Sequence, residues 1–184
     1  MESDIHGLIL TGGYSKRMGK DKALISDGNQ TMLDKIYALL THSLSDVFIS
    51  VREDQKEEDK RSEFNQIIDL DEYTGPMAGI LSAFSFSPNV AWLIVACDMP
   101  FLDNATISHL IANRNRKKFA TVFSNLGDGL PEPLCAIYEP KFFQSVLQDN
   151  QFIKNNSPRD TLIELDTHLI KPQNPKALIN TNYP

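Results

Sequence analysis

Short apolar runs alternate along the chain with segments whose apolar residues recur three or four positions apart. Continuous apolar runs bounded by turn residues are typical of buried strands, and the wider spacing is typical of amphipathic helices. Strands are predicted at residues 7–10, 47–49, 67–68, 91–96, 119–123 and 134–138. Helices are predicted from Thr31, from 75 to 86, from Asp103 or Asn104, and at 140–148 and 158–165. This alternation indicates an α/β fold with a mostly parallel sheet and helices on both faces.

Local signals support two of the helix starts. Thr31 is followed three residues later by Asp34, which resembles a capping box. Pro76 follows Gly75 at a position that suits the first turn of a helix. Between the second and third predicted strands, residues 52–63 are rich in charged side chains and are interpreted as a solvated loop or helix face.

Length and composition are those of a globular protein. The 184 residues predict about one domain, spanning 1–184. Hydrophobic residues make up 41% of the chain and charged residues 23%, which disfavours a disordered or fibrous protein. The net charge of −6 is a poor fit to a protein that coats nucleic acid, so no nucleic-acid partner is expected.

The sequence also predicts where the protein works. The first residues lack the pattern of a signal peptide, and no apolar stretch approaches the roughly 20 residues that span a bilayer. Cys97 and Cys135 both lie in apolar runs and are interpreted as buried, reduced thiols. The four histidines lack the paired spacing of a zinc site. A cytoplasmic protein without a membrane partner or a transition-metal centre is therefore expected.

A glycine pair, Gly12-Gly13, directly follows the first predicted strand. Glycine lets backbone approach a ligand closely, with its N–H groups available to phosphate oxygens. Lys16, Arg17, Lys20 and Lys22 against Asp21 then give residues 16–22 a charge of +3. Arginine can bind phosphate through two N–H groups and lysine provides a point charge. A phosphate-binding loop is one interpretation, and a solvated basic turn is the other.

The loop does not follow either of two common nucleotide motifs. Five residues separate Gly13 from Gly19, and Asp21 stands where a Walker A loop needs the Ser or Thr that binds magnesium. No GxGxxG pattern occurs at this position, which disfavours a standard dinucleotide site.

Two aspartates follow predicted strands. Asp98 comes after the most apolar strand, and Asp69 follows the third strand. Ligands of open α/β sheets bind outside the carboxyl ends of the strands, and a carboxylate beside polyphosphate is a usual ligand of Mg²⁺. Each aspartate can equally be an ordinary helix cap or loop carboxylate.

Four segments together resemble one family. Residues 10–24, LTGGYSKRMGKDKAL, resemble the signature LAGGxSxRMGxDKxL of the MobA-type molybdenum cofactor guanylyltransferases. Residues 75–80 are similar to the family's GPLAG segment, and residues 96–102, ACDMPFL, match its CDMPFL element. Residues 132–138 resemble its QPLCALY strand. The resemblance implies a Rossmann-like three-layer sandwich of the nucleotidyltransferase superfamily.

The resemblance also implies a reaction. GTP would donate GMP to the terminal phosphate of molybdopterin, giving the guanine dinucleotide cofactor and pyrophosphate. Arg17, Lys22 and Asp98 would be catalytic, and Asp98 would be the ligand of Mg²⁺. Candidate partners besides GTP and molybdopterin are molybdoenzymes or other cofactor-biosynthesis proteins. The nucleotide-binding positions implied by the resemblance are Leu10, Thr11, Gly12, Gly13, Lys22, Asp69, Gly75, Gly79 and Asp98.

The chain departs from the family pattern in three places. Thr11 stands where the family usually has alanine. The C-terminal NxNTP element keeps its second asparagine as Asn180, the implied cofactor-binding residue, but has Leu178 in place of the first. Asp69 is about one residue nearer to the GP segment than in the family. Ser50, by contrast, falls at a position where the resemblance implies a contact with nucleotide.

Two alternatives stay open. A cytidylyltransferase that uses CTP would have the same fold and metal, although the glycine pair and the GPMAG segment favour guanine. A non-catalytic protein that binds nucleotide or cofactor would also explain the loss of the first C-terminal asparagine.

Overall fold

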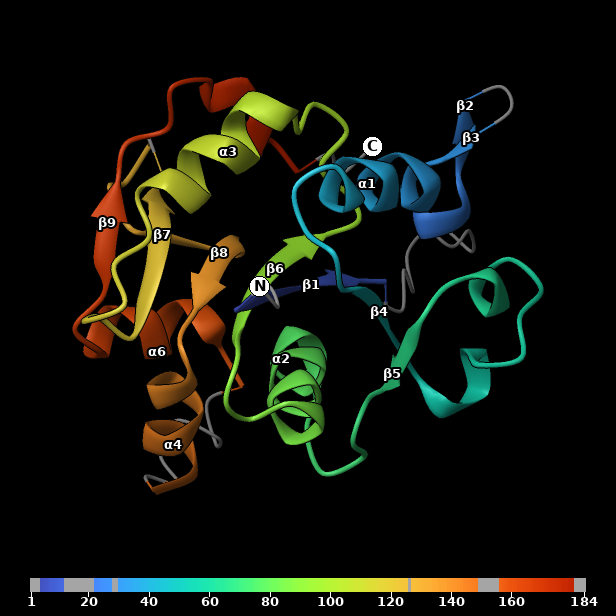
Figure 1. Cartoon of the computed structure of the whole chain (residues 1–184), viewed down its shortest axis with the longest axis horizontal. Coiled ribbons are helices and arrows are strands. Elements are labelled where there is room, and N and C mark those ends of the chain that lie inside the picture. Colours follow the sequence, from blue (N-terminus) through green and yellow to red (C-terminus); the bar gives the residue numbers. More distant parts are fainter. Residues whose placement is uncertain (1–3, 12–21, 28–29, 126, 149–155, 181–184) are drawn as a thin grey trace.

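The computed structural model describes residues 4–11, 22–27, 30–125, 127–148 and 156–180. Within these ranges seven strands form one sheet in the order β5-β4-β1-β6-β8-β7-β9 (Figure 1). All pairings are parallel except the two made by β8, which runs antiparallel to both β6 and β7. The strands are β1 Ile5–Leu10, β4 Val47–Val51, β5 Gln66–Ile68, β6 Ala91–Ala96, β7 Ala120–Ser124, β8 Pro131–Tyr138 and β9 His168–Ile170.

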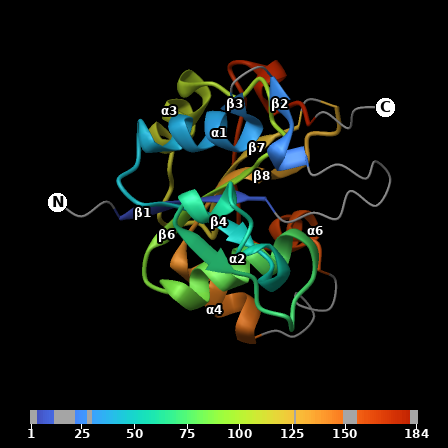
Figure 2. The ribbon, with the colours of Figure 1, turned by 90° about the vertical axis from the view of Figure 1, so that its right-hand side faces the viewer.

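Helices cover both faces of this sheet. Figures 1 and 2 show α1 (Met32–Thr41) and α3 (Asn104–Ala112) on one face. On the other face lie α2 (Gly75–Phe86), α4 (Pro140–Gln148) and α6 (Pro158–Glu164). Each helical layer packs on the sheet through its own cluster of buried apolar side chains. The predicted α/β, three-layer, mostly parallel architecture is confirmed.

The central strands explain the apolar runs of the sequence. All six residues of β6 are buried, because helices cover both faces and β1 and β8 flank its edges. A strand of this kind has no polar face, so its sequence is continuously apolar rather than alternating. β1 lies beside β6 in parallel register from Ile5↔Ala91 to Leu10↔Ala96. The two strands therefore end together at one edge of the sheet.

The helix starts agree with the sequence signals. Thr31 caps α1 in a complete capping box, in which its hydroxyl accepts from the Asp34 N–H at 3.1 Å. Asp103 caps α3 by accepting from the Thr106 N–H at 2.7 Å.

Several short elements were not predicted. They are β9, the hairpin of β2 (Ser26–Asp27) and β3 (Gln30–Thr31), and the 3-10 helices η1 (Lys22–Leu24), η2 (Glu53–Gln55), η3 (Arg61–Glu63) and η4 (Pro175–Leu178). Elements of two to four residues are too short to show a hydrophobic period.

The charge-rich segment 52–63 differs from its prediction. Most of its side chains are at least partly exposed, but Gln55 and Arg61 are buried at 3% and 0% exposure. The interpretation as a solvated loop or helix face is wrong for these two residues, because both side chains turn back toward the sheet edge.

Two smaller observations complete the description. Cys97 and Cys135 are free and buried, as predicted, and burial raises the pKa of the Cys135 thiol well above its usual range. None of the helices in the described ranges combines the length and the apolar character needed to cross a bilayer.

Candidate functional site

Four neighbouring strands bring the first group of candidate residues to one edge of the sheet. Leu10 ends β1 and pairs with Ser50 of β4 on one side and with Ala96 of β6 on the other. β5 continues this edge, because Val51 pairs with Ile68 and Asp69 follows directly. Asp98 follows β6 by two residues and is partly exposed. Residues far apart in the sequence therefore meet where the parallel strands end.

A chain of hydrogen bonds joins three of these strand ends. The Thr11 hydroxyl donates to the Ser50 carbonyl at 2.6 Å, and the Ser50 hydroxyl donates to Asp69 Oδ1 at 2.5 Å. Thr11 and Ser50 are only 3% and 2% exposed. Burial raises the pKa of the Asp69 carboxyl to about 6, against the lowering effects of the Ser50 hydroxyl and the Arg52 charge. The Asp69 carboxyl is thus fixed by the hydrogen bond from Ser50, and its charge changes near pH 6.

Helix α2 packs closely against this edge. Gly75, its first residue, has a φ of +63°, a conformation that glycine adopts without strain. A Cβ at Gly79 would lie 2.5 Å from Ser50 Oγ and 2.6 Å from Leu10 Cδ2. Both implied nucleotide-binding glycines therefore have a physical reason to be glycine, one in conformation and one in space.

Replacing Gly79 by alanine should disturb the packing of α2 against the ends of β1 and β4. The added methyl group would collide with the Ser50 hydroxyl and break its bond to Asp69, at a cost of about 1–3 kcal/mol for overpacking. We expect a lower melting temperature and weaker nucleotide binding, measured by thermal denaturation and titration calorimetry. Ala78→Gly, one position away, is the control for changes in helix propensity. Wild-type nucleotide affinity in Gly79→Ala would contradict the prediction.

A cavity of about 500 Å³ lies on the other side of β6. Strands β7 and β8, helix α6 and the segment after β9 form its walls. Its lining residues are Ser124, Asn125, Glu132, Arg159, Pro172, Pro175, Lys176, Leu178, Ile179 and Asn180. The Oδ1 atom of Asn180 is buried without a hydrogen-bond partner among the described residues. A buried acceptor of this kind favours a ligand that brings an N–H or O–H group.

Charged side chains of both signs face one another in this cavity. Arg159 lies 3.5 Å from Glu132 Oε2 and 3.6 Å from Asp128 Oδ2, and its side chain is 35% exposed. Burial raises the pKa of the Glu132 carboxyl; the charges of Asp98 and Asp128 raise it further, while the Leu134 N–H and Arg159 lower it. Val95 of β6 pairs with Cys135 of β8, so the end of β6 that precedes Asp98 lies beside the strand that carries Glu132 into the cavity.

The carboxylates at this junction suit a hard divalent cation. Mg²⁺ binds oxygen ligands and is usually held by one or two carboxylates, with phosphate oxygens and water completing the shell. Asp98 is partly exposed at the end of β6, and Glu132 is close enough for their charges to interact. This donor set fits Mg²⁺.

The structure brings most of the implied site residues together. Leu10, Thr11, Asp69, Gly75, Gly79 and Asp98 lie at or against the first edge, and Ser50 links two of them. Asn180 lies apart from them in the cavity, beside Leu178. Gly12, Gly13 and Arg17 lie outside the described residues. Lys22 begins η1, and its side chain is also outside the described part of the chain.

Sequence reasoning missed Glu132, Arg159 and Lys176. The predicted apolar strand begins at Leu134, and Glu132 enters only as the first residue of the segment that resembles the family's QPLCALY strand; a parallel strand would have carried it to the opposite edge. Because β8 is antiparallel, its first residues arrive at the edge where β6 ends. The register between β7 and β8 also shifts at Val122/Phe123, where Glu132 pairs with Phe123. Pro133 beside it was a possible signal, since proline within a strand often marks such an irregularity.

The sheet, with its carboxyl-end site and adjoining cavity, defines an α/β protein of nucleotide-binding type. Residues 7–167 match the family model described as the MobA-like NTP transferase domain. The chain belongs to this family.

Two relatives of this chain have names that refer to the molybdenum cofactor. A molybdenum cofactor biosynthesis bifunctional protein of Synechocystis sp. is 38% identical over 183 residues, which cover 100% of this chain and 52% of that protein. A protein of Bacillus anthracis, named as a probable molybdenum cofactor guanylyltransferase, is 29% identical over 151 residues, covering 79% of this chain and 74% of that one. The chain thus spans about half the length of the Synechocystis relative.

Solved structures share the fold. Molybdopterin-guanine dinucleotide biosynthesis protein A from Archaeoglobus fulgidus aligns with a TM-score of 0.73 at 20% identity, covering 97% of this chain and 93% of that one. A 4-diphosphocytidyl-2C-methyl-D-erythritol synthase from Anaerococcus prevotii aligns with a TM-score of 0.69 at 11% identity, covering 97% and 90%. At these identities the likeness concerns the fold alone.

Proposed function

We propose that this chain transfers GMP from GTP to the terminal phosphate of molybdopterin, forming the guanine dinucleotide cofactor and pyrophosphate. The family and the names of the curated relatives support this reaction class. The observation that carries the proposal is the position of Asp98. It follows β6, between the strand ends that hold Thr11, Ser50 and Asp69 and the cavity that holds Asn180. A transfer reaction needs such a junction, because donor and acceptor must meet at one point.

Asp69 supports guanine as the base. An ionised carboxylate only accepts hydrogen bonds, and the Watson–Crick edge of guanine offers an N1–H and an amino group as donors. Cytosine offers one amino group next to two acceptors, which a carboxylate would repel. Because Ser50 donates to Asp69 Oδ1, the other carboxylate oxygen can accept from the base.

The chemistry then depends on positioning and on charge. A terminal phosphate oxygen of the acceptor attacks the α-phosphorus of GTP; the new P–O bond forms as the bond to the β-phosphate bridge breaks and pyrophosphate leaves. No protein nucleophile is needed, since the attacking oxygen belongs to the acceptor. Asp98, with Glu132 nearby, would hold Mg²⁺, which supplies charge neutralisation across the phosphates. Arg17 and Lys22 would offset the charge of the α-phosphate and of the pyrophosphate.

The cavity has the groups that a phosphorylated pterin requires. Arg159 and Lys176 line it and can bind a phosphate, and Asn180 Oδ1 can accept from a ring N–H. On this proposal the acceptor would bind on the β7–β8 side of Asp98 and the nucleotide on the β1–β5 side.

Replacing Arg159 by methionine should weaken acceptor binding selectively. The variant keeps an unbranched side chain but loses the charge that faces the cavity, so the KM for molybdopterin should rise about tenfold, as for loss of one charged hydrogen bond. The KM for GTP should stay within twofold. Steady-state kinetics with each substrate varied in turn measures both constants. Arg116→Met is the control, since Arg116 is 69% exposed and pairs with Asp4 before β1. An equal rise in both KM values would argue against the separate placement of the acceptor.

The reaction itself is tested with the purified chain, Mg²⁺, molybdopterin and either GTP or CTP. Pyrophosphate release and a guanine dinucleotide product detected by mass spectrometry are expected with GTP. Turnover with CTP but not GTP would instead identify a cytidylyltransferase. Tight binding of GTP without any turnover would favour a non-catalytic carrier.

A further inference from the structure

Arg61 is completely buried, although it lies in the charge-rich segment 52–63. Among fully buried side chains in the described residues, only that of Trp92 belongs to a larger residue. Arginine is almost never fully buried unless its charge and its N–H groups are paired. The partners of Arg61 therefore indicate why the fold contains it.

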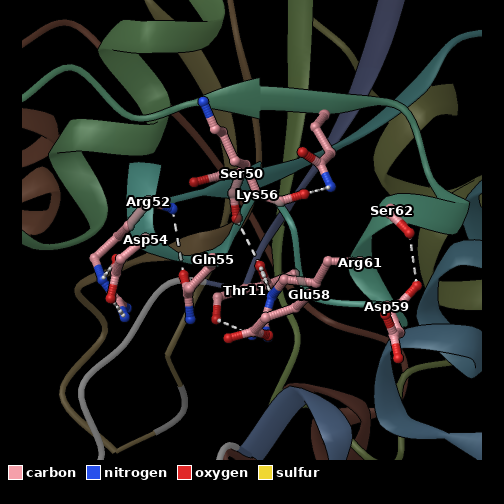
Figure 3. Close-up of polar contacts among 11 residues, drawn as sticks. Thr11, Ser50, Arg52, Asp54, Gln55, Lys56, Glu58, Asp59, Arg61 and Ser62 are labelled. Atoms are coloured by element: carbon pink, nitrogen blue, oxygen red, sulfur yellow. Dashed lines mark hydrogen bonds and ion pairs between the residues drawn. The ribbon is translucent and has the colours of Figure 1, made fainter.

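Those partners connect Arg61 to the candidate nucleotide edge. Its Nη1 forms an ion pair with Glu58, whose side chain is 39% exposed. Its Nη2 donates to the Thr11 carbonyl at 3.3 Å, and its Nε donates to the Thr11 hydroxyl at 3.4 Å. Figure 3 shows these three residues together, with Ser50 above them in the view.

The Thr11 carbonyl needs a partner from outside the sheet. The registers of β1 with β4 and with β6 both end at Leu10, so Thr11 has left the ladder. Thr11 is nevertheless only 3% exposed, and a buried carbonyl without a donor is costly. Arg61 supplies the donor and so fixes the orientation of the first residue beyond the strand.

The segment that carries Arg61 is itself anchored at two places. Lys60 bonds to Asp34 in the first turn of α1 at 2.8 Å, and Phe64 packs on Tyr37 of the same helix with ring centroids 4.6 Å apart. Gln66 in β5 donates to the Lys56 carbonyl at 3.2 Å. These contacts hold the guanidinium in place from both sides.

We propose that Arg61 is a positioning residue for the nucleotide, acting through Thr11 and Ser50 on the carboxyl of Asp69. Each link is a hydrogen bond of the structure: Arg61 donates to Thr11, Thr11 donates to the Ser50 carbonyl, and the Ser50 hydroxyl donates to Asp69. This inference rests on the proposed nucleotide site. It also gives a role to Thr11, which stands where the family usually has alanine. The Thr11 hydroxyl links Arg61 to Ser50, and an alanine would lack this link.

Two substitutions break the series of hydrogen bonds from Arg61 to Asp69 at different points. Thr11→Val removes the hydroxyl with little change of shape and leaves Arg61 in place. Arg61→Lys keeps the positive charge but loses the planar guanidinium, whose N–H groups donate to two oxygens of Thr11 at once. We expect each to raise the Kd for GTP about tenfold. The Kd for inorganic triphosphate should stay within twofold, since that probe lacks the base that Asp69 would contact. Lys56→Gln is the control, because Lys56 lies in the same segment but pairs with Glu53 at the surface.

The measurements are titration calorimetry for both ligands and thermal denaturation, at a temperature where every variant is folded. A merely structural role of Arg61 would lower the melting temperature without changing the ratio of the two Kd values, and that result would overturn the proposal. If Arg61→Lys does not fold, Thr11→Val decides: unchanged GTP affinity overturns the proposal and selective loss supports it. Failure of the wild-type chain to bind GTP would instead refute the proposed function on which it rests.

Discussion

Asp98→Asn should lower kcat about a thousandfold while the Kd for GTP changes only a few-fold. Asp98 follows β6 and is partly exposed where the nucleotide edge adjoins the cavity. Asparagine keeps the shape of the side chain but removes the negative charge that would hold Mg²⁺ at the reacting phosphates. Loss of one preorganised electrostatic contact at a reacting centre typically costs about 10²–10³ in kcat.

Single-turnover formation of the dinucleotide gives the rate of the chemical step, and calorimetry gives the Kd for GTP with and without Mg²⁺. Asp166→Asn is the matched control, since Asp166 is 63% exposed and pairs with Lys118 away from the site. The wild-type Kd should depend on Mg²⁺, and that dependence should be lost in Asp98→Asn. A variant with wild-type kcat would remove Asp98 from the mechanism.

Asp69→Asn should relax the choice of base and reduce kcat/KM for GTP about 10–100-fold, the range expected when one charged hydrogen bond of about 1.5–3 kcal/mol is lost. The amide can still accept from the Ser50 hydroxyl, so the local structure should be retained. Its NH₂ group would face the donors of guanine. Kinetics with GTP, ATP and CTP measure the discrimination. Asp71→Asn is the control, because Asp71 is exposed two residues further along.

The same carboxyl predicts a pH dependence. The pKa of Asp69 is raised by burial to about 6, so the group is ionised at pH 7 and protonated at pH 5. GTP affinity should therefore fall as the pH is lowered through 6, whereas Asp69→Asn should show a flat profile. The contribution of Asp69 to fold stability has the opposite sign. Its folded-state pKa exceeds the ordinary 3.8, so its protonation stabilises the fold as the pH falls from about 6 toward 4. An identical pH profile in the variant would show that another group titrates.

The sequence is informative wherever structure is local. The capping box at Thr31, the cap at Asp103 and the start of α2 follow from signals within a few residues, and all three are present. Asp69 and Asp98 could be placed at one edge because parallel strands end at the same side of a sheet. Even with its shortened spacing to Gly75, Asp69 lies at this edge, bonded to Ser50.

The sequence is uninformative where a residue depends on a distant partner. Arg61 lies among charged neighbours that face water, and only its contact with Thr11, 50 residues away, distinguishes it. Glu132 depends on the direction of β8, which no local pattern reveals. Arg159 and Lys176 reach one cavity from elements separated by β9.

On the proposed function, the reversed direction of β8 assigns the two substrates to different parts of the chain. The edge proposed for the nucleotide consists of strand ends from the first hundred residues, whereas the cavity proposed for the acceptor consists of segments between Ser124 and Asn180. The two parts of the sheet meet along the pairing of β6 with β8. Exchanging residues 124–180 for those of a relative with a different acceptor should therefore change which phosphate is nucleotidylated and leave the choice of nucleoside triphosphate intact. If each substrate binds where it is proposed to bind, its specificity can be changed without changing that for the other.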